Sequence, residues 1–310
     1  MLQDNHFDIV QVEGLELGSY LPLIRERAGS AGIVYDAHNA EITLQKRAMQ
    51  TDRRVAGRWP AALYSWLQLG RLARFEAEVC RMADAVTVVS AEDGAALAAL
   101  APGLKPMIVP NGIDLAEYQP LPEAQPSGNT IVFTGKMDYR PNLDAAMRLV
   151  NQILPRLQTG WPDIELQLVG QNPLPALLRL HAPPAITITG AVPDTRPFIA
   201  GAAVYAAPLR MGGGTRFKLL EAMALARPIV STRLGAEGFD VETGREMLLA
   251  DGAEEFAQAV LKLLNDHGKA TEIGANGRRF VELNYDWRSI LPRLDAVHAA
   301  VLAARRLAGS

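Results

Sequence analysis

The sequence has almost no cysteine, since Cys80 is its only one. An internal disulfide, a cysteine zinc cluster and a redox cysteine pair are therefore excluded, and a reducing compartment is expected. Long hydrophobic runs are also absent: the longest, such as Ile199–Leu209, fall well short of the roughly 18 residues that span a bilayer. Residues 1–10 lack a cationic start before an apolar run, so we do not expect a signal peptide. We expect a cytoplasmic protein whose only contact with a membrane would be peripheral.

An excess of charge of one sign is missing as well, because the formal net charge at pH 7 is −3. This balance gives no reason to expect a nucleic acid as partner, and any anion-binding site must be local. With 49% hydrophobic and 21% charged residues, the composition is that of a folded globular protein. The 310 residues allow two domains of ordinary size, each with its own core.

Short apolar stretches typical of strands alternate with helical patterns along the whole sequence. The expected strands are Asp8–Val12, Gly32–Asp36, Ala85–Val89, Met107–Val109, Thr130–Thr134, Ile164–Val169, Ile186–Thr189, Ala203–Ala207 and Pro228–Ser231. This alternation indicates an α/β fold with parallel sheets and crossover helices. Because the strands lack polar alternation, we expect helices on both faces of each sheet.

The domain boundaries are predicted from composition. A stretch rich in proline, glycine and polar residues predicts a linker over residues 115–129. It separates an N-terminal domain over residues 1–114 from a C-terminal domain over residues 130–286. Apolar residues at helical spacing then predict a final helix over residues 287–310.

The segment Lys46–Arg81 holds eight basic and three acidic residues, interleaved with aromatic ones. An amphipathic helix of this composition is suited to lie on an anionic membrane surface. The alternative is a long helix packed on the sheet, with its arginines in water and its tryptophans in the core. The sequence leaves both interpretations open.

The run at 210–224, RMGGGTRFKLLEAMA, is the clearest candidate site, because it joins a glycine-rich turn to a helix with two cations and a carboxylate. We expect the helix to begin near Thr215, so that backbone N–H groups of the three glycines face a bound anion. Arg216 and Lys218 add charge that suits a diphosphate, and Glu221 can accept hydrogen bonds from ribose hydroxyls. The alternative is an ordinary turn before a solvated helix.

Two further candidates directly follow expected strands, where ligands of open parallel sheets bind. In the first, Gly135–Asn142, Lys136 is placed to reach a phosphate, and Asn142 is expected to cap a helix or touch the ligand. In the second, Asp36–Glu41, His38 could donate to a sugar hydroxyl or exchange a proton with it. Taken alone, Lys136 and His38 could equally be surface and loop residues.

Taken together and in this order, these stretches resemble glycosyltransferase family 4, retaining sugar transferases with the GT-B fold, and their exopolysaccharide-associated branch above all. The resemblance is carried by His38-Asn39, Ala83–Ser90, Val109–Asp114, Gly135–Asn142, Val169-Gly170, Gly190–Val192 and Pro208–Ser231. It covers nearly the whole chain. It implies two Rossmann-like domains that face each other across a cleft, with the sugar nucleotide on the C-terminal one and the last helix crossing back.

The resemblance also implies roles for individual residues. The implied catalytic residues are His38, Lys136, Arg216 and Lys218. The implied donor-binding residues are Gly135, Asn142, Gly170, Ala191, Val192, Gly212, Gly213, Gly214, Thr215 and Glu221. Among these, Glu221 would hold the ribose, and the backbone at Ala191 and Val192 would meet the base. No metal ion and no cofactor is expected, because cations and the helix N-terminus would stabilise the leaving diphosphate.

Three departures from the family pattern are visible. Gly213 stands where the family usually has a glutamate, eight positions before Glu221. Lys136 replaces the usual arginine, and Pro141 the usual lysine. Roughly the first half of an N-terminal Rossmann domain is also expected to be missing, judged against a usual size of about 100 to 200 residues.

The resulting hypothesis is a hexosyltransferase that takes a nucleoside-diphosphate sugar as donor and a glycan or lipid-linked molecule as acceptor. It would act in cell-surface polysaccharide or glycolipid synthesis, in the cytoplasm or at the inner face of the cytoplasmic membrane. One alternative is a catalytically silent fragment or partner subunit that binds the donor without turnover. The other is a sugar-nucleotide epimerase of similar fold, which needs no acceptor.

Overall fold

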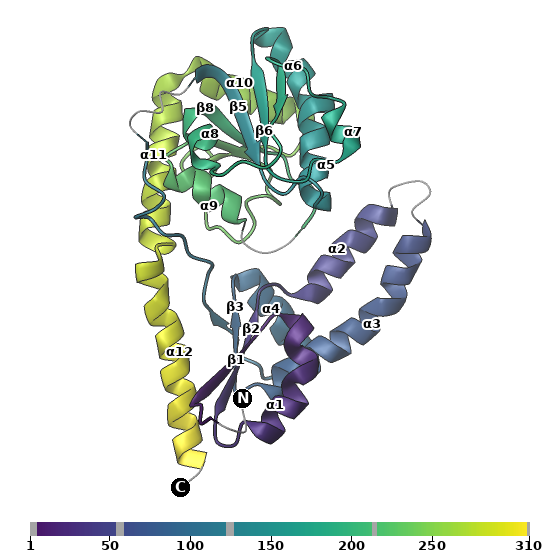
Figure 1. Cartoon of the computed structure of the whole chain (residues 1–310), viewed down its shortest axis with the longest axis vertical. Coiled ribbons are helices and arrows are strands. Elements are labelled where there is room, and N and C mark those ends of the chain that lie inside the picture. Colours follow the sequence, from purple (N-terminus) through teal and green to yellow (C-terminus); the bar gives the residue numbers. More distant parts are fainter. Residues whose placement is uncertain (1–4, 54–58, 122–126, 213–215, 309–310) are drawn as a thin grey trace. The chain divides into compact units, whose positions relative to one another are not determined.

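The computed structural model describes residues 5–53, 59–121, 127–212 and 216–308 (Figure 1). The chain divides into two compact units. Of the described residues, unit 1 contains 5–53, 59–111, Gly212 and 288–308, and unit 2 contains 112–121, 127–211 and 216–287. Each unit is built on its own parallel sheet.

The sheet of unit 1 has four parallel strands in the order β1-β2-β3-β4. The strands are β1 (Ile9–Glu13), β2 (Gly32–Ala37), β3 (Ala85–Val88) and β4 (Met107–Ile108). The helices are η1 (Leu15–Tyr20), α1 (Leu21–Arg27), α2 (Glu41–Arg53), α3 (Trp59–Met82), α4 (Ala91–Leu100) and α12 (Trp287–Ala308), of which only the first residue of α12 lies in unit 2.

Both faces of this sheet are covered, which explains why its strands lack polar alternation. Ile33 and Tyr35 of β2 pack into one core with Val79 of α3. Val34, between them, faces the other way and packs against Val297 and Val301 of α12. The last helix therefore returns to the first unit, as the predicted fold class requires.

Polar contacts hold α12 on unit 1. This helix, drawn in yellow, lies along β1 (Figure 1). Arg305 pairs with Asp84 at 2.7 Å, and Asp84 also pairs with Arg25 of α1 at 3.1 Å. His298 of α12 lies 3.2 Å from the side chain of Gln11 in β1. One carboxylate thus joins two helices next to the start of β3.

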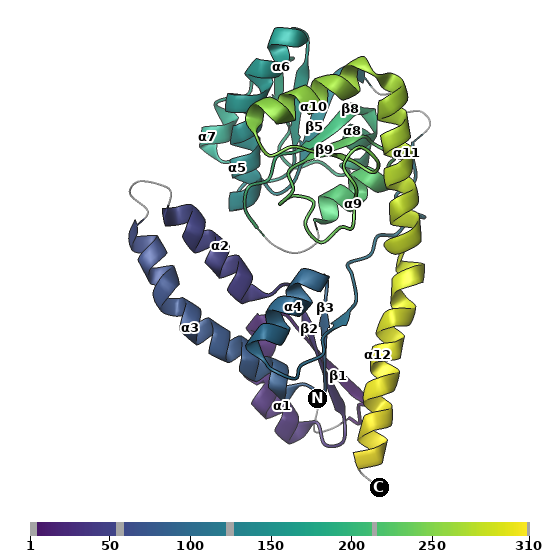
Figure 2. The same ribbon diagram turned by 180° about the vertical axis from the view of Figure 1, so that it is seen from behind.

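Helices α2 and α3 run side by side and pack on each other (Figures 1 and 2). Along α3, Phe75 packs on the core, but Tyr64 is 63% exposed and Trp66 is 60% exposed. The expectation that the tryptophans of this segment lie in the core is therefore wrong for Trp66. Within the described residues, no helix is both long and apolar enough to cross a membrane.

The sheet of unit 2 has six parallel strands in the order β10-β9-β8-β5-β6-β7. They are β5 (Ser127–Thr134), β6 (Glu165–Val169), β7 (Ile186–Ile188), β8 (Ala202–Ala207), β9 (Ile229–Ser231) and β10 (Leu248–Leu249). The helices are α5 (Arg140–Arg148), η2 (Leu149–Ile153), α6 (Leu154–Gly160), α7 (Pro175–Leu178), α8 (Arg196–Gly201), α9 (Phe217–Ala224), α10 (Ala253–Asn265) and α11 (His267–Asn284).

Two local features of unit 2 differ from the sequence-based expectation. Strand β5 begins at Ser127, inside the stretch expected to be a linker, because Ser127 pairs with Ala202 of β8. Helix α9 begins at Phe217, two residues after Thr215, and the backbone of Arg216, its N-cap residue, is extended with ψ 95°. The expected contacts of Gly213, Gly214 and Thr215 lie outside the described residues.

Candidate functional site

The strand order of unit 2 reverses at β5. Strands β6 and β7 follow on one side of it, whereas β8, β9 and β10 lie on the other. A ligand of an open parallel sheet binds outside the carboxyl ends of the strands at such a switch point. Gly135 follows β5 and Pro208 follows β8, so both segments singled out from the sequence of this unit leave the sheet there.

Lys218 of α9 occupies this switch point. Its Nζ donates to the carbonyl oxygen of Thr134, the last residue of β5, at 2.7 Å, and to Oδ1 of Asn142 at 2.6 Å. It also lies 4.2 Å from the centroid of the Phe133 ring. An ammonium has three N–H donors, so one remains beyond these two bonds. The structure thus brings together two residues predicted from different parts of the sequence.

The charge on Lys218 is poorly compensated. Its pKa is lowered from the ordinary 10.5 to about 7, mainly by burial and to a smaller extent by the neighbouring Arg216, against the opposing effect of Glu221. Both acceptors of its hydrogen bonds are neutral amide oxygens. An anion that reached Lys218 and Arg216 would therefore offset the electrostatic cost of burying this charge.

Asn142 holds Lys218 in place and does not cap its helix. The N-cap residue of α5 is Tyr139, and it makes no side-chain cap bond. Asn142 is the third residue of α5 and is 7% exposed, and its Nδ2 donates to the carbonyl oxygen of Lys136 at 2.9 Å. One amide therefore links the loop after β5 to the lysine of α9.

Glu221 lies one turn after Lys218 and is bonded to a residue that the sequence reasoning missed. The hydroxyl of Tyr118 donates to Oε1 of Glu221 at 2.8 Å. Burial raises the pKa of Glu221, while the bond from Tyr118 and the charge of Lys218 lower it. Tyr118 in turn carries the guanidinium of Arg196 over its ring, 5.6 Å from the centroid.

Tyr118 belongs to the segment that composition assigned to the linker, and no motif marks it. Its ring packs edge-on against Phe217 at 6.5 Å, directly beside the N-cap of α9. Arg196 is tied to Asp194 at 2.9 Å. Only the tertiary fold shows that these side chains meet, because 103 positions separate Tyr118 from Glu221.

The loops after β5 and β6 approach each other through glycines. A Cβ on Gly170 would lie 1.9 Å from the carbonyl oxygen of Gly135, and Gly170 has φ +147°. The amide of Gly135 donates to Val169 at 3.0 Å, and that of Met137 to Gln171 at 2.8 Å. Gly170 is therefore required by backbone contact, whatever its role toward a ligand.

The chain entering the glycine run is held from several sides. Buried Arg148 of α5 donates to the carbonyl oxygen of Pro208 at 3.2 Å. Arg210 pairs with Asp144 at 2.6 Å. Gly212 then has φ +106°, a conformation that favours glycine. These contacts fix the course of the chain from the end of β8 as far as Gly212.

The remaining predicted residues of unit 2 lie near the same edge with more solvent around them. Lys136 is exposed and lies 3.7 Å from Asp138, so its ammonium is available to a ligand. Ala191 is exposed and Val192 packs partly on the core, in the loop after β7. No contact in the structure assigns a ligand to these three residues.

His38 belongs to unit 1, where it follows β2 and is exposed. The loop behind it is firmly held: the fully buried Glu76 accepts the amide of Glu41 at 2.7 Å, and Asp93 accepts that of Ala40 at 2.9 Å. Burial raises the pKa of Glu41, and nearby Glu16 raises it further. The role of His38 stays a prediction.

Comparisons with known proteins show which sequences and folds this chain is similar to. Residues 128–266 match the family model described as glycosyl transferases group 1. The chain is 30% identical over 206 residues to phosphatidyl-myo-inositol mannosyltransferase of Mycolicibacterium smegmatis. The aligned segment covers 63% of this chain and 52% of that protein. Both matches are similarities, and the residues matched by the family model lie almost entirely in unit 2.

Solved structures show that the fold extends beyond this domain. Sucrose-phosphate synthase of Thermosynechococcus elongatus superposes with a TM-score of 0.76 at 20% identity, over 96% of this chain and 74% of that one. Anabaena HepE in complex with UDP gives 0.75 at 15% identity, over 96% and 80%. The predicted GT-B-like fold class is thus confirmed. The chain spans about half the length of the curated relatives it matches.

Proposed function

We propose that this protein is a retaining glycosyltransferase that transfers a sugar from a nucleoside-diphosphate sugar to a glycan or lipid-linked acceptor. Its pathway would be the synthesis of a cell-surface polysaccharide or glycolipid. The observation that supports the proposal is Lys218, a buried lysine whose positive charge is only partly balanced by its neighbours. It lies at the switch point of the sheet, within the residues that match the glycosyl transferases group 1 model.

In this proposal the diphosphate of the donor binds at Lys218, Arg216 and the start of α9. Negative charge grows on the leaving diphosphate as the bond to the sugar breaks, and cations held in place before the reaction stabilise it without reorganisation. Asn142 keeps Lys218 aimed at that position through its 2.6 Å bond. Lys136, exposed on the neighbouring loop, adds a third cation. Neither a metal ion nor a cofactor enters this scheme.

The ribose of the donor would bind Glu221. One carboxylate oxygen of Glu221 is bonded to Tyr118, so the other is available to accept from a ribose hydroxyl. Ala191 and Val192 would meet the base, while Gly135, Gly170, Gly212 and residues 213–215 would meet the diphosphate and sugar. His38 would contact the donor sugar from unit 1. These assignments follow from the resemblance of the sequence.

The test is turnover of a panel of UDP-, GDP- and ADP-sugars by the full chain, with and without lipid-linked acceptors. We expect release of nucleoside diphosphate, a loss of at least tenfold in donor affinity for Lys218→Met, and no loss for the matched variant Lys262→Met, since Lys262 is exposed on α10. Donor binding without turnover would favour the silent donor-binding protein instead. Inversion of a sugar centre without acceptor would favour the epimerase.

We also propose that α3 brings the enzyme to an anionic membrane surface. Tyr64 and Trp66 project into solvent, and the exposed Arg71 and Arg74 follow on the same helix. Aromatic side chains favour the lipid headgroup region, and each arginine adds electrostatic attraction. Cosedimentation with phosphatidylglycerol vesicles should fall for Trp66→Ser but not for Trp287→Ser, a second partly exposed tryptophan. Equal binding of both variants would refute this contact.

A further inference from the structure

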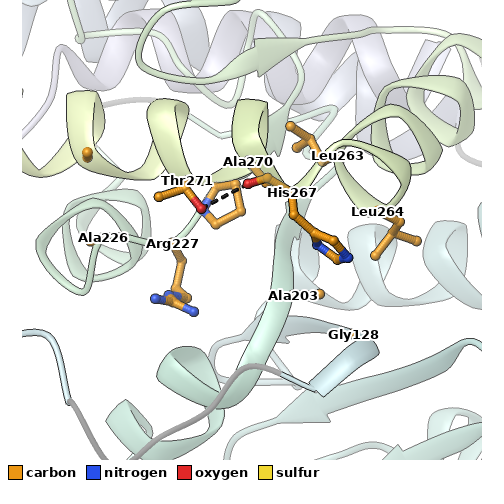
Figure 3. Close-up of a pocket in the computed structure, with 11 residues that line it drawn as sticks. Gly128, Ala203, Ala226, Arg227, Leu263, Leu264, His267, Ala270 and Thr271 are labelled. Atoms are coloured by element: carbon orange, nitrogen blue, oxygen red, sulfur yellow. Dashed lines mark hydrogen bonds between the residues drawn. The ribbon is translucent and has the colours of Figure 1, made fainter.

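A cavity of about 250 Å³ lies in unit 2, at the edge of the sheet away from the candidate donor site (Figure 3). Gly128, Ala203 and Pro228 line it from the amino ends of β5, β8 and β9. Helices α10 and α11 close it from the other side. The donor-site residues Gly135 and Pro208 follow the carboxyl ends of β5 and β8. The cavity and the donor site therefore lie at opposite ends of the strands of one sheet.

The cavity contains a guanidinium without an acidic partner. Arg227 follows the C-terminus of α9, where its amide bonds to Ala222 at 2.9 Å. Among the described residues, its side chain makes one hydrogen bond, from Nε to the carbonyl oxygen of Leu225 at 3.3 Å. Within the described residues, no carboxylate pairs with it. Burial alone lowers the pKa of Arg227, and no neighbouring acid opposes this effect.

A structural role does not account for this arginine fully. Cations near the end of a helix bond its last carbonyls, and the contact to Leu225 fits that role. A single bond from Nε, however, leaves the two terminal nitrogens with four N–H groups for other acceptors. Those nitrogens are the ones that bind a carboxylate in two parallel hydrogen bonds.

The rest of the lining is mostly apolar. Leu263, Leu264 and Ala270 form the wall that α10 and α11 provide. The hydroxyl of Thr271 donates to the carbonyl oxygen of His267 at 2.8 Å, so its proton is not available to a ligand. The close-up shows both the Arg227 and His267 side chains at the cavity (Figure 3). A ligand that fits carries one negative charge on an apolar body of a few carbons.

We propose that this cavity binds a small aliphatic carboxylate, whose head group pairs with Arg227 and whose chain lies against Leu263 and Leu264. The site is separate from the proposed transferase reaction and does not depend on it. A charged head bonded to the guanidinium and a buried chain of several methylene groups each contribute to affinity.

The experiment titrates the full chain with hexanoate, followed by calorimetry and by amide shifts of Ala203, Ala226 and Thr271. Hexanol keeps the chain without the charge, and inorganic phosphate keeps a negative charge without the chain. We expect hexanoate to bind about 10- to 100-fold more tightly than either, because a charge-assisted hydrogen bond adds to apolar burial.

Two variants and a control locate the binding. Arg227→Gln should lose that 10- to 100-fold preference for hexanoate over hexanol, roughly the value of a charge-assisted bond. Arg279→Gln, which removes an exposed arginine of α11, should keep it. Ala275→Leu fills the cavity from an exposed lining position and should abolish binding while preserving the fold. Equal affinity of the wild type for hexanoate and hexanol, phosphate binding as tight as hexanoate binding, or hexanoate binding unchanged in Ala275→Leu would each overturn the proposal.

Discussion

Binding of a nucleoside diphosphate should be coupled to the uptake of a proton by Lys218. With a pKa of about 7 in the free protein, Lys218 is about 10% protonated at pH 8. A diphosphate in contact with its Nζ favours the ammonium and returns the pKa toward the ordinary 10.5. At pH 8, Lys218 should therefore take up close to 0.9 proton for each nucleotide bound. At pH 6 the share of Lys218 should fall to about 0.1 proton, and the terminal phosphate of the nucleotide titrates as well.

The measurement is calorimetric titration with UDP and with GDP in buffers that differ in ionisation enthalpy. The dependence of the observed enthalpy on buffer gives the number of protons. At pH 8 the terminal phosphate of the nucleotide is already ionised, since its second pKa is near 6, so it takes no part. Lys218→Met, which keeps an apolar stem against Phe133, should remove the uptake, whereas Lys262→Met should not.

The same pKa makes a prediction for stability without ligand. Because the folded pKa of Lys218 is lowered, the folded state binds fewer protons than the unfolded state between about pH 7 and 10.5. The free energy of unfolding should therefore rise with pH through this window. Subtracting the pH profile of Lys218→Met isolates this contribution. In the nucleotide titration, an uptake at pH 8 below about 0.3 proton, or the same uptake in Lys218→Met, would refute the coupling of nucleotide binding to protonation of Lys218.

Three further changes test other parts of the structure. Gly170→Ala should destabilise unit 2 by several kcal/mol in urea unfolding, because its Cβ would meet the carbonyl oxygen of Gly135, whereas Gly201→Ala, which meets nothing within 4 Å, should cost less than about 1 kcal/mol. Tyr118→Phe should cost about 1 kcal/mol and raise the pKa of Glu221, followed by carboxyl NMR titration, because the bond from the tyrosine lowers that pKa. An unchanged carboxyl titration would show that the 2.8 Å contact does not form in solution.

Most strands could be predicted from the sequence because each is an unbroken run of apolar residues. Nearly every residue of β8 is buried, so its apolar run is long enough to be recognised without polar alternation. The pair Leu248-Leu249 of β10 is too short to give such a signal. The start of β5 at Ser127 could not be predicted, because the residues there are polar. They extend the strand only because Ser127 pairs with Ala202 of the neighbouring strand β8.

The candidate site was predictable only in part, for a related reason. Lys218 and Glu221 belong to one local motif, so their spacing along a helix could be read directly. Asn142 belongs to the other predicted motif, but only the fold shows that it accepts a hydrogen bond from Lys218. Tyr118, which donates to Glu221, comes from a distant segment and carries no motif. Helix α9 begins within two residues of the position expected from the glycine run, after the extended backbone of Arg216.

The packing of α12 on the sheet of unit 1 has a consequence for biosynthesis. Val34 leaves the ribosome more than 250 residues before the valines that cover it, Val297 and Val301. Unit 2 is complete in sequence by Trp287, so it can fold while one face of the N-terminal sheet is still open. The N-terminal unit of this chain should therefore finish folding after unit 2, whereas N-terminal domains usually fold first during synthesis. Until α12 has been made, the N-terminal unit is the part of the chain that needs a chaperone.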